Sequence, residues 1–383
     1  MNNSVTRIIL SGVKLALQLR LLPDVERAAK LKATVEAFNA ACDWLAGEAF
    51  DLKLANKVKL QQIFYRDLRC RFGLSAQMAI RCIAQVVGSY RRDKAKRPRF
   101  RKHAAMPYDE RIMSFKGVDR VYLLTLQERV IVPFVMGKYQ RERFALAKGQ
   151  SDLVLRKDGR WFLLVTADVP EKTPIPHTDF IGIDLGVANL ATTSDGGRFG
   201  GEKVESVRQG YHVRRQTLQH AAARRKAKGR RPKAIRRALR RTGGRESNFR
   251  RDINHVISKQ LVTLATDTGR GIALEELTHI RSRTRFRRSQ RAKMAGWAFL
   301  QLRAFIAYKA QLAGVQLAIV DPRDTSRTCS VCGHCEKANR QSQSEFCCQS
   351  CGHIANADIN AALNIRARAL STGFKVSEQR LVA

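Results

Sequence analysis

The spacing of hydrophobic positions changes along the chain and divides it into segments. Residues 7 to 20 alternate between apolar and polar side chains, which predicts a strand. From 24 to 90 the apolar residues return every three or four positions, which predicts a small helical unit. Short apolar runs between 106 and 170 predict further strands, with a hairpin turn at Asp158-Gly159. We expect the opening strand to join their sheet.

The second half of the chain predicts an α/β unit. Residues 180 to 200 suit an antiparallel meander of three short strands, and further strands are expected at 271–275 and 315–320. Helical segments separate these strands, an order typical of a layered fold with a mixed sheet. Glycines and prolines interrupt the basic segment 213–251, so we expect its helices to break at Gly229, Pro232 and Gly243-Gly244.

Charge narrows the possible partners. The 383 residues include 71 Lys and Arg against 33 Asp and Glu, a formal net charge of +38. The excess is densest in 213–251 and in 281–293. Such a field attracts a polyanion, so nucleic acid is the expected partner, with solvated basic faces or a membrane surface as alternatives. No apolar run is long enough to span a bilayer and the first residues lack a signal-peptide core, so we expect a cytoplasmic protein.

Cysteine spacing predicts a metal site. Two Cys-x2-Cys pairs, each followed by a glycine, are separated by fifteen residues, and their members are Cys329, Cys332, Cys348 and Cys351. Four thiolates at this spacing predict one structural Zn²⁺ in a closed tetrahedral site. Cys335 and Cys347 are left over, and a register with Cys347 in place of Cys348 stays open. His334 and His353 are interpreted as neighbours of the site.

Three acids stand at the ends of predicted elements. Asp184 lies in an apolar strand, Glu275 ends another with Glu276 beside it, and Asp358 opens a predicted helix. Carboxylates that converge in this way can hold two Mg²⁺ ions and promote hydrolysis of a phosphodiester. Each residue also has a structural interpretation. Asp358 could only cap its helix and Glu275 could be a surface acid, whereas a charge at Asp184 needs a partner.

Together these motifs resemble the TnpB family, transposon-encoded RNA-guided nucleases related to type V CRISPR effectors. The resemblance is carried by Gly182-Ile183-Asp184-Leu185-Gly186, by Leu274-Glu275-Glu276-Leu277, by the cysteine pairs, and by the run from Asp358 to Ile365, in that order. It covers 177–372, about half of the chain. One departure is Asn356-Ala357-Asp358, where the family often has Asp-Arg-Asp.

The resemblance implies a multidomain α/β and α+β fold. An RNase H-like RuvC nuclease domain would carry an inserted zinc ribbon, and an N-terminal β-barrel (wedge) domain would carry an inserted helical recognition lobe. The implied boundaries are 1–22 and 106–176 for the wedge, 23–105 for the recognition lobe, 177–325 and 353–372 for the nuclease, 326–352 for the ribbon, and 373–383 for a tail.

The implied function is RNA-guided cleavage of double-stranded DNA. Asp184, Glu275 and Asp358 would be the RuvC acids holding two catalytic Mg²⁺ ions, with Glu275 preferred over Glu276 by register. A guide RNA from the transposon end and a short flanking motif would select the target, in a monomeric ribonucleoprotein associated with a prokaryotic nucleoid. The alternatives are a nuclease-inactive guided repressor, a DDE-type transposase, and a zinc-ribbon RNA-binding protein without catalysis.

Overall fold

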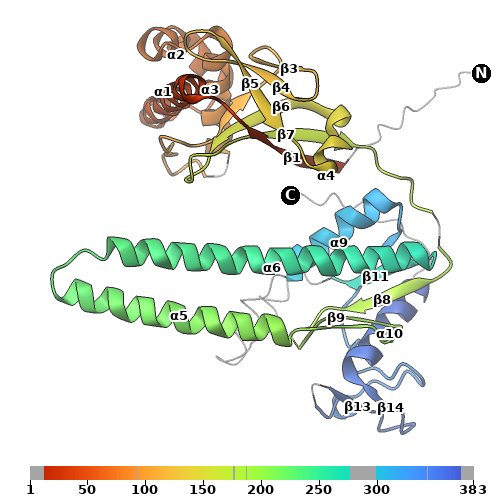
Figure 1. Cartoon of the computed structure of the whole chain (residues 1–383). Coiled ribbons are helices and arrows are strands. Elements are labelled where there is room, and N and C mark those ends of the chain that lie inside the picture. Colours follow the sequence, from red (N-terminus) through yellow and green to blue (C-terminus); the bar gives the residue numbers. More distant parts are fainter. Residues whose placement is uncertain are drawn as a thin grey trace, which may run out of the picture. The chain divides into compact units, whose positions relative to one another are not determined.

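The computed structural model describes residues 13–91, 93–175, 177–186, 188–276, 299–342 and 344–371. The chain divides into two compact units, residues 1–170 and 171–383 (Figure 1). The basic segment 281–293 and the predicted tail 373–383 lie outside the described residues.

The first unit contains a curved, barrel-like sheet of seven strands. Its order is β2-β6-β7-β1-β5-β4-β3, and every pairing is antiparallel. The strands are β1 (Val13–Leu21), β2 (Met106–Tyr108), β3 (Met113–Lys116), β4 (Arg120–Leu124), β5 (Arg129–Val135), β6 (Ala147–Leu155) and β7 (Trp161–Val169). The opening strand does join the sheet, between β7 and β5, and Gly159 lies in the predicted hairpin turn between β6 and β7.

Three helices pack on this sheet and share its core. They are α1 (Val25–Asp51), α2 (Lys57–Phe72) and α3 (Ala76–Tyr90), and the short α4 (Lys138–Arg141) and η1 (Phe144–Leu146) follow later. Asp24, Asn56 and Ser75 each accept a hydrogen bond from a backbone N–H of the helix that follows, as N-caps do. The apolar stripe of α1 and the inner faces of the strands belong to one continuous hydrophobic core.

The second unit is built on a mixed sheet of five strands in the order β10-β9-β8-β11-β12. The first three, β8 (Phe180–Asp184), β9 (Asn189–Thr193) and β10 (Arg198–Gly200), form the predicted antiparallel meander. β11 (Gly271–Glu275) runs parallel to β8 and to β12 (Leu317–Val320). The carboxyl ends of β8, β11 and β12 therefore lie at the same edge.

Helices cover both faces of this sheet. On one face, α6 (Lys233–Asp267) and α9 (Phe299–Ala313) pack against Ile181, Ile183 and Leu274. On the other, α10 (Ala357–Ser371) packs against Phe180, Ala273 and Val320. A small β-hairpin of β13 (Glu345–Cys347) and β14 (Ile354–Asn356), with the 3-10 turn η2 (Lys337–Asn339), leads directly into α10.

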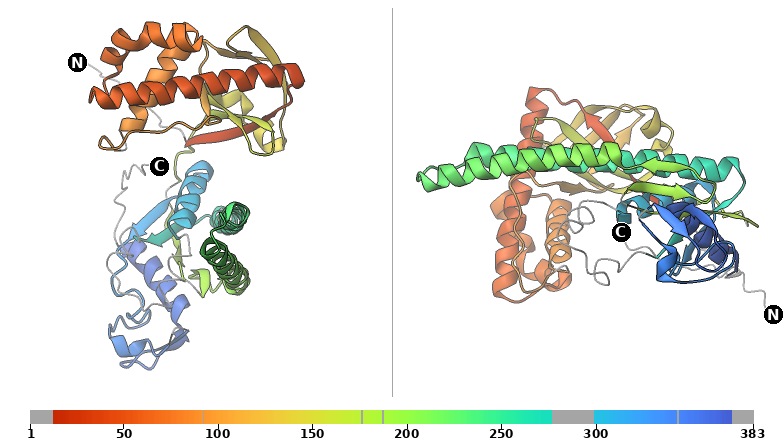
Figure 2. Two further views of the ribbon diagram at one scale, coloured as in Figure 1. Left: turned by 90° about the vertical axis from the view of Figure 1, so that its left-hand side faces the viewer. Right: turned by 90° about the horizontal axis from the view of Figure 1, so that it is seen from below.

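Helices α5 (Glu202–Ala227) and α6 form a long antiparallel hairpin that extends past the sheet (Figure 2). The chain breaks at 228–232, as Gly229 and Pro232 predict, but the expected break at Gly243-Gly244 is wrong. Each glycine costs a helix about 1 kcal/mol, and this is offset because α6 packs along both α5 and α9. None of the helices in the described ranges is both long and apolar enough to cross a membrane.

The crossing of α10 over β8 is a backbone-to-backbone contact. A Cβ placed on Gly182 would lie 2.0 Å from the carbonyl oxygen of Ala362 and 2.7 Å from the amide nitrogen of Arg366. Neither atom is a flexible side chain that could move aside, so only glycine fits here. Arg366 also holds the start of β8 through a two-point ion pair with Asp179, with N–O distances of 2.9 and 2.8 Å.

The first prediction concerns this crossing. Gly182→Ala should lower the free energy of unfolding of the second unit by about 3 kcal/mol or more, because α10 must move off the strand. Denaturant unfolding followed by circular dichroism measures this. Gly210→Ala, at an exposed position of α5 where a Cβ meets nothing within 4 Å, is the matched control and should be neutral or slightly stabilising. Equal stability of the two variants would contradict the role given to Gly182.

Candidate active site and metal centre

Strand alternation directs two of the predicted acids to one face of the sheet. Side chains of a strand point alternately to opposite faces. Ile181 and Ile183 face α6 and α9, so Asp184 points to the α10 side, and Ala273 likewise places Glu275 on the α10 side. Because β8 and β11 are parallel neighbours in register at Ile183 and Leu274, the two acids come next to each other at the same sheet edge.

Asp358 reaches the same edge from the second position of α10. The helix is capped by Asn356, whose side-chain oxygen accepts from the backbone N–H groups of Asp358 and Ile359 at 3.2 and 3.3 Å. The Asp358 carboxylate is therefore not the cap. It is buried, one oxygen accepts a 2.9 Å hydrogen bond from the Asn189 side chain, and the other lies 3.6 Å from the guanidinium of Arg340.

The three carboxylates interact electrostatically. Burial and the negative charges of Glu275 and Asp358 raise the pKa of Asp184 to about 7, although Arg340 acts in the opposite direction. Burial also raises the pKa of Glu275, while a hydrogen bond from Thr325 lowers it. Like charges held this close in a poorly solvated place disfavour full ionisation, and a cation would relieve the repulsion.

Glu276 has a different environment. Its two oxygens accept hydrogen bonds from both terminal nitrogens of Arg303 on α9, whose side chain is 9% exposed. A bidentate pair of this kind is a strong, geometrically fixed contact. The one-residue shift along the chain thus turns Glu276 toward α9, while Glu275 faces the other acids.

Several residues that shape this edge were given no role of their own from the sequence. Thr325 donates its hydroxyl to Glu275, and its own carbonyl accepts from Asn364 of α10 at 2.8 Å. Asn360, fully buried, donates to the Thr328 carbonyl at 2.8 Å and accepts from the Ser330 amide at 3.0 Å. Two asparagines four residues apart on an otherwise apolar helical face are a usable signal, because buried amides need partners.

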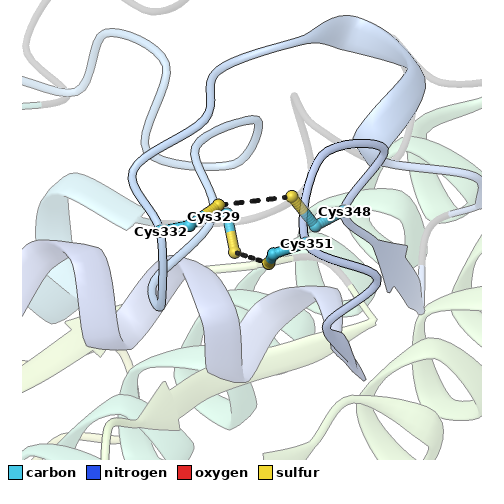
Figure 3. Close-up of side chains that lie close together, drawn as sticks. All are labelled: Cys329, Cys332, Cys348 and Cys351. Carbon is cyan, nitrogen blue, oxygen red and sulfur yellow. Dashed lines mark hydrogen bonds between the residues drawn. The ribbon is translucent and has the colours of Figure 1, made fainter.

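The predicted cysteine ligands do come together (Figure 3). Sγ atoms of Cys329, Cys332, Cys348 and Cys351 all lie within 4.8 Å of one another. Among the described residues these four are the one set gathered as a metal ion requires, and Cys335, Cys347 and the two histidines are not part of it. The three acids lie within electrostatic reach of one another without forming such a set.

The two halves of the cluster have the same local geometry. In each, the first cysteine's amide donates to the carbonyl five residues on, and the glycine's amide donates back to that cysteine's carbonyl, at 2.9 and 3.0 Å in both cases. Gly333 and Gly352 make this turn with φ of 76° and 72°, which favours glycine. Both knuckles therefore aim their thiols at one point.

The thiols cannot all ionise without a cation. The backbone N–H groups of Cys351 and Ser350 lower the pKa of Cys348 to about 6. At Cys351 the backbone N–H of His353 favours the thiolate, yet the neighbouring thiols and burial raise the pKa to about 12. Once one thiol has ionised, its negative charge opposes ionisation of the next. A bound divalent metal ion offsets this repulsion.

Comparisons with known proteins match most of the second unit and the last strand of the first. A family model described as a probable transposase matches residues 162–278, and one described as a Cas12f1-like TNB domain matches residues 299–365. The chain is 34% identical over 222 residues to the CRISPR-associated endodeoxyribonuclease Cas12f1 of Sulfoacidibacillus thermotolerans, which covers 55% of this chain and 50% of that protein. It thus spans about half the length of this relative.

Other relatives align over more of their length. The chain is 29% identical to the putative RNA-guided DNA endonuclease InsQ of Escherichia coli, over 76% of this chain and 73% of that one. It is 24% identical to a TnpB-like protein of Methanocaldococcus jannaschii, over 71% and 98%. Among solved structures, Cas12f1 from a complex with guide RNA and target DNA aligns with a TM-score of 0.61 over 93% of this chain and 99% of that chain, at 12% identity. This chain shares its mixed α/β fold.

The second prediction uses the raised pKa of Asp184. Between about pH 4 and 7 the folded protein keeps a proton that the unfolded chain has released, so this group makes stability fall as pH rises through that window. In Mg²⁺-free buffer, Asp184→Asn should raise the free energy of unfolding by about 1–3 kcal/mol at pH 8, and by less as the pH is lowered toward 4.

Urea unfolding at several pH values tests this. Asp195→Asn is the control, because Arg270 holds the pKa of Asp195 below its usual range and that variant should instead lose stability at neutral pH. A gain at Asp184→Asn that does not depend on pH would show that charge repulsion is not its cause.

The third prediction decides the cysteine register. Cys348→Ser should lower the metal content below one equivalent and destabilise the residues around β13 and β14, since Cys348 is a buried member of the cluster. Cys347→Ser should keep one equivalent. Zinc released on thiol modification and read with a chromogenic chelator gives the count, and metal loss in the Cys347 variant alone would reverse the assignment.

Proposed function

We propose that this chain, which belongs to the TnpB family, is an RNA-guided DNA endonuclease. The observation that carries the proposal is the convergence of Asp184, Glu275 and Asp358 at one edge of a mixed sheet. Three acids from two parallel strands and a helix are what a RuvC-type nuclease needs. The name of InsQ, a putative RNA-guided DNA endonuclease that aligns over most of this chain, supports the same activity.

The acidic edge fits divalent cations. Mg²⁺ prefers a few carboxylate oxygens together with substrate oxygens, and two such ions supply the polarisation needed for phosphodiester hydrolysis. Within the chain, Asn189 orients Asp358 and Thr325 orients Glu275, so each acid keeps an oxygen in a fixed direction. The mutual repulsion that raises the pKa of Asp184 favours a cation at this place.

We propose that the segment holding the cysteine cluster is a zinc ribbon, and that its zinc ion has a structural rather than a catalytic role. Four thiolates leave no open position for a substrate. The ribbon has a very small core, made of Cys329, Phe346, Cys348 and Ala357, so a bound metal would supply much of its folding energy.

Guide RNA and target DNA are the proposed partners. Every Lys and Arg between residues 224 and 241, along the distal part of the α5–α6 hairpin, is exposed. In 213–251 the one glutamate, Glu246, is buried and pairs with Arg215 across the hairpin, so it does not weaken the field outside. Such a surface suits phosphates, while base pairing with the guide would select the target.

The implied domain roles remain part of this proposal. The sheet of the first unit would be the wedge and α1 to α3 the recognition lobe, with a short motif beside the target read by residues that we do not assign. Loss of an acid would favour a guided but inactive repressor, and all three acids are present.

The fourth prediction tests the activity. Co-expressed with RNA from its own locus, the protein should cut a guide-matched plasmid in Mg²⁺, and Glu275→Gln or Asp358→Asn should reduce the rate at least about 100-fold, because each removes a metal ligand. Asp195→Asn is the matched control, since it neutralises a carboxylate at the opposite edge of the same sheet. Guide-dependent binding without cutting in the wild type would favour the repressor, and no guide-dependent binding would overturn the proposal.

A further inference from the structure

Arg340 links the ribbon to the acidic edge. It follows η2, and its backbone pairs with Phe346 of β13 in an isolated antiparallel bridge. The preceding residue, Asn339, is fully buried and donates to the carbonyls of Arg327 and His334 at 2.9 and 3.1 Å, and it accepts from the Gln349 amide at 2.9 Å. The backbone of Arg340 is therefore fixed by the same knuckles that carry the cysteines.

The head of this side chain lies at Asp358. One terminal nitrogen of Arg340 is 3.6 Å from a carboxylate oxygen of Asp358, a distance of ion pairing that is too long for a strong hydrogen bond. The arginine side chain is 30% exposed against 11% for Asp358. The guanidinium, whose Nε also makes a long 3.4 Å hydrogen bond to the Ser342 carbonyl, borders water, while the carboxylate is fixed by its helix and by Asn189.

Other cations around this edge have different partners. Arg303 is engaged with both oxygens of Glu276. Arg368 donates to the Asp321 carbonyl at 2.7 Å and acts on Glu275 only through its charge. Arg340, by contrast, forms an ion pair with a member of the acidic trio, Asp358. The ribbon thus delivers a positive charge to the place where a metal ion would have to bind.

We infer that Arg340 is a positioning residue that stands in for a divalent cation at Asp358 and withdraws when the metal binds. The inference rests on the proposed function, since it concerns the same acidic edge. In the metal-free protein the guanidinium offsets the repulsion among the three carboxylates, and in the loaded protein it competes with the metal for Asp358. The ribbon would in this way set the metal affinity of the nuclease.

The test measures metal binding and stability without any cleavage. Titration of the full-length protein with Mn²⁺, followed by electron paramagnetic resonance, should show about three- to tenfold tighter binding in Arg340→Gln than in the wild type. The thermal midpoint of the same variant without added metal should fall. Arg340→Lys keeps the charge and should bind Mn²⁺ like the wild type. Arg327→Gln removes an exposed charge of the same ribbon, paired with Asp324, and should change neither quantity.

The outcomes separate this inference from the proposed function. A damaged fold would weaken metal binding and lower stability together. The stand-in role is therefore supported only if Arg340→Gln binds Mn²⁺ more tightly while its thermal midpoint falls. Unchanged or weaker Mn²⁺ binding in Arg340→Gln, with normal binding in the wild type, would overturn the inference alone. If the wild type binds no Mn²⁺ at a site that Asp358→Asn removes, the acidic edge does not hold a metal ion. Both the inference and the proposed metal mechanism would then be wrong.

Discussion

The contact between α10 and β8 at Gly182 is the constraint on which the second unit depends. Two backbones meet there with no room for a Cβ, so the helix lies as close to the strand as packing allows. This depth brings Asp358 to the edge where Asp184 and Glu275 end their strands. The same helix also carries Asn360 and Asn364, which hold the chain entering the ribbon. The acidic edge and the segment that carries the cysteines are thus positioned by one helix.

The carboxylates at the acidic edge repel one another. Three carboxylates share a poorly solvated place, which burial alone makes unfavourable for charge. Neutral donors from Asn189 and Thr325 and the charge of Arg340 offset part of the cost. Because repulsion remains, the site should become more stable when a carboxylate is neutralised or a cation is bound. Such local conflict is characteristic of functional sites rather than of structural ones.

The cysteine cluster lies in a segment that has almost no hydrophobic core. The segment from 326 to 356 is too short to bury a core of its own, and its apolar centre is little more than Phe346 and two of the cysteines. Two identical knuckles direct four thiols to one point, where ionisation of one opposes that of the others. A metal would convert this repulsion into folding energy. Arg340 belongs to the same segment, which places its charge beside Asp358 at the acidic edge.

The sequence predicted those features that depend on residues close together along the chain. Alternation and helical spacing predicted the strands, the meander and the helical unit of the first half, and Cys-x2-Cys spacing predicted the thiol cluster. The break expected at Gly243-Gly244 was wrong because packing against α5 and α9 outweighs local propensity. Only the tertiary structure decided that Glu276 faces Arg303 and that Arg340 meets Asp358. These contacts join residues on elements whose approach is set by burial and backbone shape, which no short window of sequence encodes.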